Sequence, residues 1–264
     1  MSGIRLTYLD VIRGIGIILV VLSHSTYPSL MSWANGFFMP LFYIVSGFLD
    51  KTDSNCFSFS RCIYNKSRRL LVPYLFWSVL ISIFTFSLST PDFIGILYSR
   101  PVLFKDGFEN NIVLLNNYLR PLWFLTSMFT SYVVYYLVLK ANKPIRLFLL
   151  LFCIVITIGI KYIPILLPWS IDTAFMGALY IFAGRKIREY DCVLSGDKNI
   201  PIVLISITLY VLLHIVNGAE NMSISLFGRF APFSFICGIC GTFFLLSIIR
   251  RLERSAACSP IWGG

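Results

Sequence analysis

The first long apolar segment of the chain carries an arginine and a histidine, Arg13 and His24, at a spacing that suits one face of a helix. A helix turns about 100° per residue, so the eleven steps from Arg13 to His24 end roughly 20° past three full turns and leave both side chains on one face. The two residues would lie about 16 Å apart along the helix axis. Asp10 precedes Arg13 by one turn and can hold its guanidinium. Such a helix could bind an anionic group at Arg13 and place an imidazole, a suitable general base, near the reactive end of that group.

A second interpretation of the same residues involves no chemistry. In this interpretation, Arg13 reaches the membrane surface with its long side chain and His24 caps the other end of the helix. Spacing alone does not decide between a reactive helix and an ordinary membrane anchor.

A second group of basic residues lies at the start of another apolar run, in the segment 66–77 with the sequence KSRRLLVPYLFW. The adjacent side chains of Arg68 and Arg69 can hold phosphate groups through bidentate hydrogen bonds. The alternative is that the cluster anchors the cytoplasmic end of a membrane helix beside an aromatic belt. Both interpretations place it at the mouth of a transmembrane helix.

Further candidates lie inside later apolar runs. Asp172 and His214 are ionisable, and such groups are costly in a membrane and usually functional, but each could also pair with a neighbouring polar side chain. Cys237 and Cys240 have the spacing of a redox motif, yet they lie within an apolar run, so we interpret them as packing residues. The sequence contains no glycine-rich phosphate loop, no His-Glu-x-x-His metal site and no Gly-x-Ser-x-Gly elbow, and we expect no metal.

The elements that position these residues are apolar runs of membrane-spanning length. Of the 264 residues, 57% are hydrophobic and 13% are charged, against roughly 25% charged in soluble domains. A run of about twenty apolar residues must be helical, because hydrocarbon leaves backbone groups no other partner. We therefore predict an all-α, polytopic transmembrane helical bundle of about eight spans, at 11–29, 34–50, 70–88, 121–139, 145–163, 165–184, 200–217 and 228–249.

The distribution of lysine and arginine predicts the orientation of this bundle. Eight spans divide the loops into two sets, and one set with its adjoining helix ends holds 17 of the 22 basic residues. By the positive-inside rule that set is cytoplasmic, which places both the N-terminus and the C-terminus in the cytoplasm. The net charge of +10 is explained in this way, and we expect no nucleic-acid partner because the basic residues lie in short clusters between apolar runs.

Three further segments need interpretation: the first apolar run, the polar stretch 89–120 and the C-terminal tail. The first run could be mistaken for a cleavable signal peptide, but Asp10 and Arg13 at its edge favour a retained span. The longest polar stretch on the outer side, 89–120, is either a surface loop or part of an acceptor site. We predict a single membrane domain over 1–254, followed by a short tail over 255–264.

Several stretches resemble the acyltransferase-3 family of membrane O-acyltransferases, especially the branch similar to fucose 4-O-acetylases. The first span, YLDVIRGIGIILVVLSHS, resembles the opening helix of that family, with an arginine, ten residues and a histidine. The segments that resemble its later helices are FFMPLFYIVSGFL, RRLLVPYLFW, PLWFLTSMF, IDTAFMGALYIFAGRKI and NGAENMSISLFG. The resemblance covers nearly the whole chain.

The resemblance implies a multi-pass enzyme of the bacterial cytoplasmic (inner) membrane that transfers an acetyl group from cytoplasmic acetyl-CoA to a hydroxyl of a glycan or lipid-linked sugar. The catalytic group would comprise His24, Arg13 and Asp10. The donor phosphates would be bound by Arg13, Arg68 and Arg69. Residues that support the site or contact the substrate would be Trp123, Tyr74 and Asp172.

Members of that family usually have about ten spans, so the resemblance also leads us to expect a chain that lacks its last two helices. Two other functions therefore stay open at this point. One is a transporter or flippase for a sugar-linked substrate, in which the ionisable residues line a pathway. The other is an inactive remnant of an enzyme. The sequence does not indicate an oligomeric state.

Overall fold

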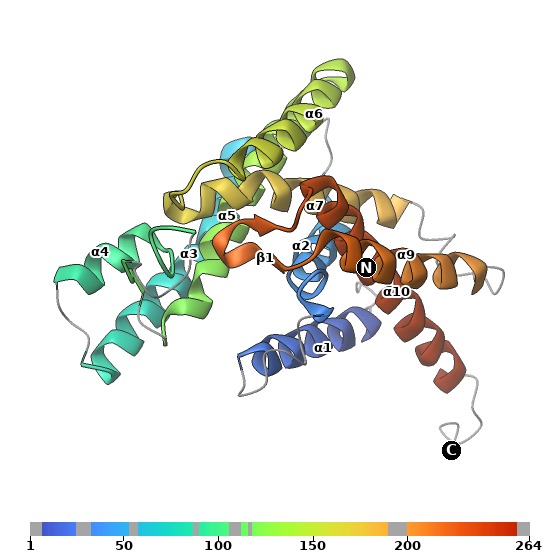
Figure 1. Cartoon of the computed structure of the whole chain (residues 1–264), viewed down its shortest axis with the longest axis horizontal. Coiled ribbons are helices and arrows are strands. Elements are labelled where there is room, and N and C mark those ends of the chain that lie inside the picture. The colour runs from blue at the N-terminus through green and yellow to red at the C-terminus, as the bar shows by residue number, and fades with distance from the viewer. Residues whose placement is uncertain are drawn as a thin grey trace.

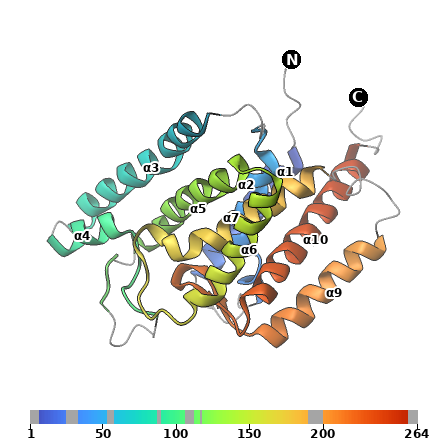
Figure 2. The same cartoon turned by 90° about the horizontal axis from the view of Figure 1, so that it is seen from above.

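Helices make up most of the chain (Figures 1 and 2). The computed structural model describes residues 7–24, 33–52, 58–86, 90–105, 112–115, 118–189 and 200–257. Its helices are α1 (Thr7–Ser23), α2 (Phe38–Leu49), α3 (Phe59–Phe84), α4 (Thr90–Tyr98), α5 (Trp123–Lys140), α6 (Lys143–Ile160), α7 (Ile171–Glu189), α9 (Ile200–Asn217) and α10 (Ala231–Ala257). Between α9 and α10, β1 (Glu220–Asn221) and β2 (Leu226–Phe227) pair as a small antiparallel hairpin.

Each of the eight predicted runs contains a helix, which confirms the all-α prediction. α3 begins at Phe59, well before the predicted start at 70, because no glycine or proline interrupts this stretch and one of its faces packs on the core through residues such as Cys62 and Ile63. α4 lies within the polar stretch 89–120, for which the sequence allows either a surface loop or part of an acceptor site. The predicted helical residues 25–29 and 87–88 lie outside the described residues.

Five helical segments in the described chain are long and apolar enough to cross a membrane. They are Phe59–Phe84, Arg120–Lys140, Lys143–Ile160, Ile200–Asn217 and Ala231–Glu253. α2 has 12 residues, which is about 18 Å of helix against a hydrocarbon core of about 30 Å. α7 is long enough, but charged residues lie in both of its end turns. The chain is thus a multi-pass membrane protein, and the count of eight spans stays a prediction.

α2 lies in the middle of the bundle, where it packs against α7, α10 and α1, while α5 packs between α7 and α3 (Figure 2). Two glycines allow α2 and α7 to touch through their backbones. A Cβ at Gly47 would overlap with the carbonyl oxygen of Ile181, and one at Gly184 with that of Ile44. Small residues at a crossing are typical of membrane helices that approach this closely.

The start of α1 and the end of α10 lie at the same end of the bundle. The guanidinium of Arg250 lies 5.3 Å from the centroid of the Tyr8 ring. We call this the basic end, because Arg13, Lys66 and Arg69 also lie there around one cavity. The opposite end, which we call the loop end, holds the segments 99–105 and 218–230.

Candidate active site

Helix α1 connects two cavities of the described structure. Arg13 lines one of about 480 Å³ at the basic end, and His24 lines another of about 550 Å³ at the loop end. We call them the basic cavity and the histidine cavity. His24 follows the last residue of α1, and its backbone N–H still donates to the carbonyl of Val21 at 3.2 Å. Arg13 therefore lies on α1 and His24 directly follows it, and the predicted pair faces two separate spaces.

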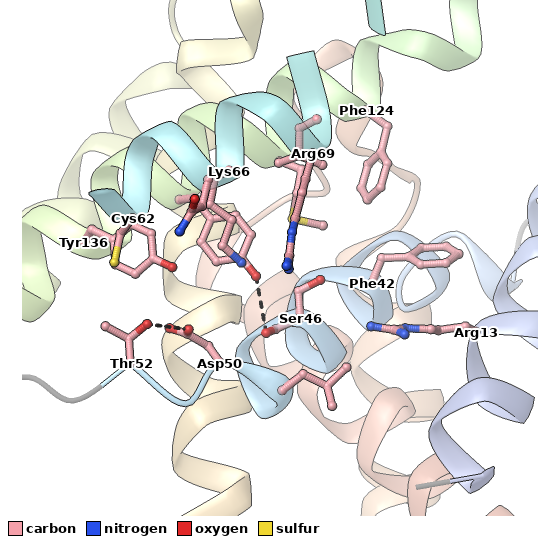
Figure 3. A pocket seen from close by; sticks show the side chains of 15 residues that line it. Arg13, Phe42, Ser46, Asp50, Thr52, Cys62, Lys66, Arg69, Phe124 and Tyr136 are labelled. Carbon is pink, nitrogen blue, oxygen red and sulfur yellow. Dashed lines mark hydrogen bonds between the residues drawn. The ribbon is translucent and has the colours of Figure 1, made fainter. Parts of the chain in front are cut away.

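Positive charge dominates the basic cavity, which α1, α2, α3 and α5 enclose (Figure 3). Arg13, Lys66 and Arg69 line it, and Asp50 is the acidic residue among its lining side chains. The Lys66 ammonium lies 3.5 Å from the centroid of the Tyr132 ring, a cation–π contact that holds the lysine at the wall. Three cations against one carboxylate favour an anionic ligand such as a phosphate.

Asp50 has one oxygen available for a ligand. Its Oδ1 accepts a hydrogen bond from Thr52 Oγ1 at 2.7 Å, whereas the buried Oδ2 has no hydrogen-bond partner among the described residues. A buried acceptor without a donor is unfavourable by about 1–3 kcal/mol, so a ligand N–H or O–H would be bound well there. Sequence analysis missed Asp50, because a carboxylate that directly follows an apolar run is also typical of a membrane interface.

The structure separates the two arginines that the sequence pairs. Arg69 lines the basic cavity, whereas Arg68 lies outside its lining, with its guanidinium 5.9 Å from the centroid of the Tyr64 ring. Neighbouring residues on a helix point about 100° apart, and here Arg68 is on the side turned away from the cavity. Asp10 lies outside both cavity linings and is 3.8 Å from the guanidinium of Arg13, as its spacing predicts.

His24 presents an unprotonated nitrogen when its ring is neutral. Its Nδ1 lies 2.8 Å from the carbonyl oxygen of Val20. A carbonyl oxygen can only accept, so Nδ1 carries the hydrogen in this contact and Nε2 carries the lone pair. The last turn of α1 therefore sets the tautomer that a general base needs.

The rest of the histidine cavity combines aromatic rings with polar groups. Trp123, predicted as a supporting residue, lines it together with Phe38 and Glu220. Other lining residues with polar side chains are Ser23, Asn35, Arg120, Asn221 and Ser223. Sequence analysis did not single out Glu220, although a carboxylate in the short segment between two apolar helices was a usable signal.

Glu220 is a buried residue of the hairpin, at the start of β1. Its Oε1 accepts a hydrogen bond from Asn217 Nδ2 at 2.7 Å, and only 5% of the residue is exposed. Asn217 also binds the returning chain, because its Oδ1 accepts from the backbone N–H of Phe230 at 2.8 Å. Burial raises the pKa of the Glu220 carboxyl above its usual range, although hydrogen bonds from Asn217 and Ser234 oppose the shift.

The raised pKa of Glu220 predicts a pH dependence of stability. Between the ordinary glutamate pKa and the raised one, the folded protein keeps a proton that the unfolded chain has released, so the free energy of unfolding falls as pH rises. Glu220→Gln should flatten this fall, which the midpoint of thermal unfolding in detergent, measured at several pH values, will reveal. Glu253→Gln near the other end of α10 is the control, and equal slopes in wild type and Glu220→Gln would contradict the prediction.

A buried ion pair supports the floor of the histidine cavity. Arg100, which is 0% exposed, pairs with Asp172, and Ser225 Oγ donates to Asp172 Oδ2 at 2.6 Å. The same guanidinium donates from Nη1 to the carbonyl of Ser223 at 2.9 Å. Ser223 lines the cavity, but Asp172 does not. Asp172 therefore supports the loop that contains Ser223 through Arg100, without lining the cavity itself.

Two other candidates lie outside both cavity linings. The Tyr74 hydroxyl donates to the carbonyl of Ile96 at 2.6 Å and so fastens α4 to α3. His214 stacks on Tyr210 with ring centroids 5.7 Å apart and lines a separate apolar cavity. Cys237 is fully buried and unpaired, as the packing interpretation requires.

These features define a class of protein: a helical membrane protein with a basic cavity at one end and a histidine-bearing cavity at the other. The sequence pattern of the acyltransferase domain known as acyltransferase 3 matches residues 6–261. The chain belongs to this family and is therefore a membrane acyltransferase. No curated protein and no solved structure matches it significantly.

Proposed function

We propose that the protein is an O-acetyltransferase that takes an acetyl group from acetyl-CoA and transfers it to a hydroxyl of a cell-surface or lipid-linked glycan, in the manner of the fucose 4-O-acetylase-like branch. The observation that carries the proposal is the arrangement on α1. Arg13 lines a cavity suited to phosphates, and His24, whose Nδ1 contacts the Val20 carbonyl, lines a second cavity suited to a polar acceptor.

The basic cavity is the proposed donor site. Arg13, Lys66 and Arg69 would bind the phosphates of the donor, and the free Oδ2 of Asp50 would accept an N–H or O–H from its nucleotide or pantetheine part. Acetyl-CoA occurs in the cytoplasm, and the positive-inside rule assigns the lysine- and arginine-rich end to the same side. The basic end is then cytoplasmic in the bacterial inner membrane, with both ends of the chain on that side.

The histidine cavity is the proposed acceptor site. A sugar offers apolar C–H faces and several hydroxyls, which suit the indole of Trp123 and the polar groups of Glu220 and Asn35 respectively. Hydrogen bonds to a buried carboxylate are directional, so Glu220 would decide which hydroxyl points toward His24. This site would face away from the cytoplasm.

His24 would move the proton. Its Nε2 takes the proton of the acceptor hydroxyl while that oxygen forms a bond to the carbonyl carbon of the thioester. The bond from this carbon to sulfur breaks, and His24 returns the proton to the departing thiolate. The products are an acetyl ester and free CoA, so atoms and charge balance without a metal or a redox partner.

The direct test uses membranes that contain the protein, labelled acetyl-CoA and glycans from the host surface. Transfer of label to an alkali-labile ester on the glycan supports the proposal. Exchange of a sugar-linked substrate across the membrane without any acyl transfer would instead indicate a transporter. Comparison of surface-glycan acetylation with and without the gene would identify the acceptor.

A matched pair of substitutions tests the donor site. Arg69→Ala removes a cavity guanidinium, and the loss of a charged hydrogen bond, about 1.5–3 kcal/mol, should raise the KM for acetyl-CoA roughly tenfold or more. Arg68→Ala removes the same charge next to it but outside the cavity, and should change KM little. Initial rates at varied acetyl-CoA check both. Equal effects would mean that net charge, and not the cavity, binds the donor.

A further inference from the structure

Two phenylalanines lie where the basic cavity approaches the histidine cavity. Phe42 of α2 and Phe124 of α5 both line the basic cavity, and their ring centroids are 5.6 Å apart (Figure 3). Their near neighbours Met39 and Trp123, one turn and one residue away, line the histidine cavity. The two rings, which we call the phenylalanine pair, therefore stand between the two spaces.

Packing on three sides holds the phenylalanine pair in place. The Phe124 ring meets the rings of Tyr43 at 5.3 Å and Trp123 at 6.1 Å. The Phe42 ring lies against α1 at Gly16, where a Cβ would approach its Cζ to 2.8 Å. Gly16 lies on α1 between Arg13 and His24, so the line from donor site to base passes the edge of the Phe42 ring.

The two rings are only partly buried, although their neighbours Tyr43 and Trp123 are buried. Both rings line the basic cavity, and in the proposed function an acyl group that moves from it toward His24 passes beside them. Because neighbours pack against the two rings on three sides, the rings can move little. The gap, meaning the space beside the phenylalanine pair, therefore limits the size of the acyl group that can pass.

We propose that the phenylalanine pair selects the acyl group, admitting a two-carbon acetyl and rejecting longer chains. This inference rests on the proposed function and adds a size limit to it. One methylene more or less in a fitted apolar site changes discrimination by about 10–200-fold. Substitution of either ring by a smaller side chain should therefore admit longer acyl groups.

The experiment measures transfer from acetyl-CoA and butyryl-CoA in competition, as the ratio of their kcat/KM values, in membranes with equal amounts of protein. Phe42→Leu and Phe124→Leu should each shift this ratio toward butyryl by about tenfold or more. Phe129→Leu is the matched control, because Phe129 packs on Trp169 and lines neither cavity. It should keep the wild-type ratio.

A variant that shifts the ratio of kcat/KM values in the opposite direction distinguishes a change of gap width from general damage to the fold. Gly16→Ala adds a methyl group that presses on the Phe42 ring, so it should narrow the gap and shift the ratio toward acetyl. Opposite shifts from the leucine and alanine variants support the proposal.

An unchanged ratio in both leucine variants, with acetyl transfer intact in the wild type, overturns the size limit alone. So does an equal shift in Phe129→Leu. Absence of transfer from any thioester by the wild type overturns the proposed function, and the size limit with it. The two failures are therefore distinguishable.

Discussion

Replacement of His24 by alanine should lower the rate of acetyl transfer by about 10²–10⁴-fold, the usual contribution of a general base. The Val20 carbonyl fixes the hydrogen on Nδ1 and leaves Nε2 to take the proton of the acceptor hydroxyl. The KM for acetyl-CoA should change little, because the proposed donor site is the other cavity. Initial rates in membranes, normalised to the amount of protein, check both quantities.

Two further variants make the result specific. His24→Gln keeps a polar side chain of similar length but no base, and should be as slow as His24→Ala. His214→Ala removes the other histidine of the chain, which stacks on Tyr210 away from the two cavities, and should retain transfer. A wild-type rate in His24→Ala would exclude the proposed mechanism.

Replacement of Asp172 by alanine should destabilise the fold by about 3–5 kcal/mol, because it leaves the guanidinium of Arg100 buried without its counter-charge. The midpoint of thermal unfolding in detergent should fall accordingly, and a dye that reacts with the buried free cysteines can follow it. Acetyl transfer should fall as well, since the loop that contains Ser223 loses its support.

The control for this prediction is an ion pair near the surface. Glu189→Gln weakens the contact between Glu189 and Lys186, two side chains of which about half is exposed (42% and 49%), and such pairs contribute about 0–1 kcal/mol. A double variant, Arg100→Met with Asp172→Leu, should recover part of the loss, because no unpaired charge is left buried. Equal effects of Asp172→Ala and Glu189→Gln would contradict the structural role.

The helices could be predicted from sequence because each depends on a local pattern. Runs of apolar residues force the backbone to pair internally, so the eight predicted runs each contain a helix. The early start of α3 at Phe59 could not be seen in this way, because its first turns are largely polar and are only partly buried, against other helices. The shared helix of Arg13 and His24 also followed from local spacing.

Contacts between distant segments could not be predicted. Arg100 and Asp172 are 72 residues apart, and the sequence placed the arginine in a polar stretch that could be either a surface loop or part of an acceptor site. Glu220 and Asp50 border apolar helices, where a carboxylate is equally typical of an interface. Arg68 and Arg69 look equivalent until the helix turns one toward the cavity and the other away. Of the residues predicted for the site, Arg13, Arg69, His24 and Trp123 line the two cavities, whereas Asp50 and Glu220, which help to complete the walls, were not predicted.

The short length of α2 has a consequence for the membrane itself. With 12 residues, α2 spans about 18 Å, so the two cavities that flank it occupy depth which lipid fills elsewhere. Phe42 and Phe124 line the basic cavity, and their neighbours Met39 and Trp123 line the histidine cavity, so little apolar material separates the two spaces. In the proposed acetyl transfer, this arrangement would shorten the path of the acyl group across the membrane, and the same aromatic rings would have to limit the leakage of protons.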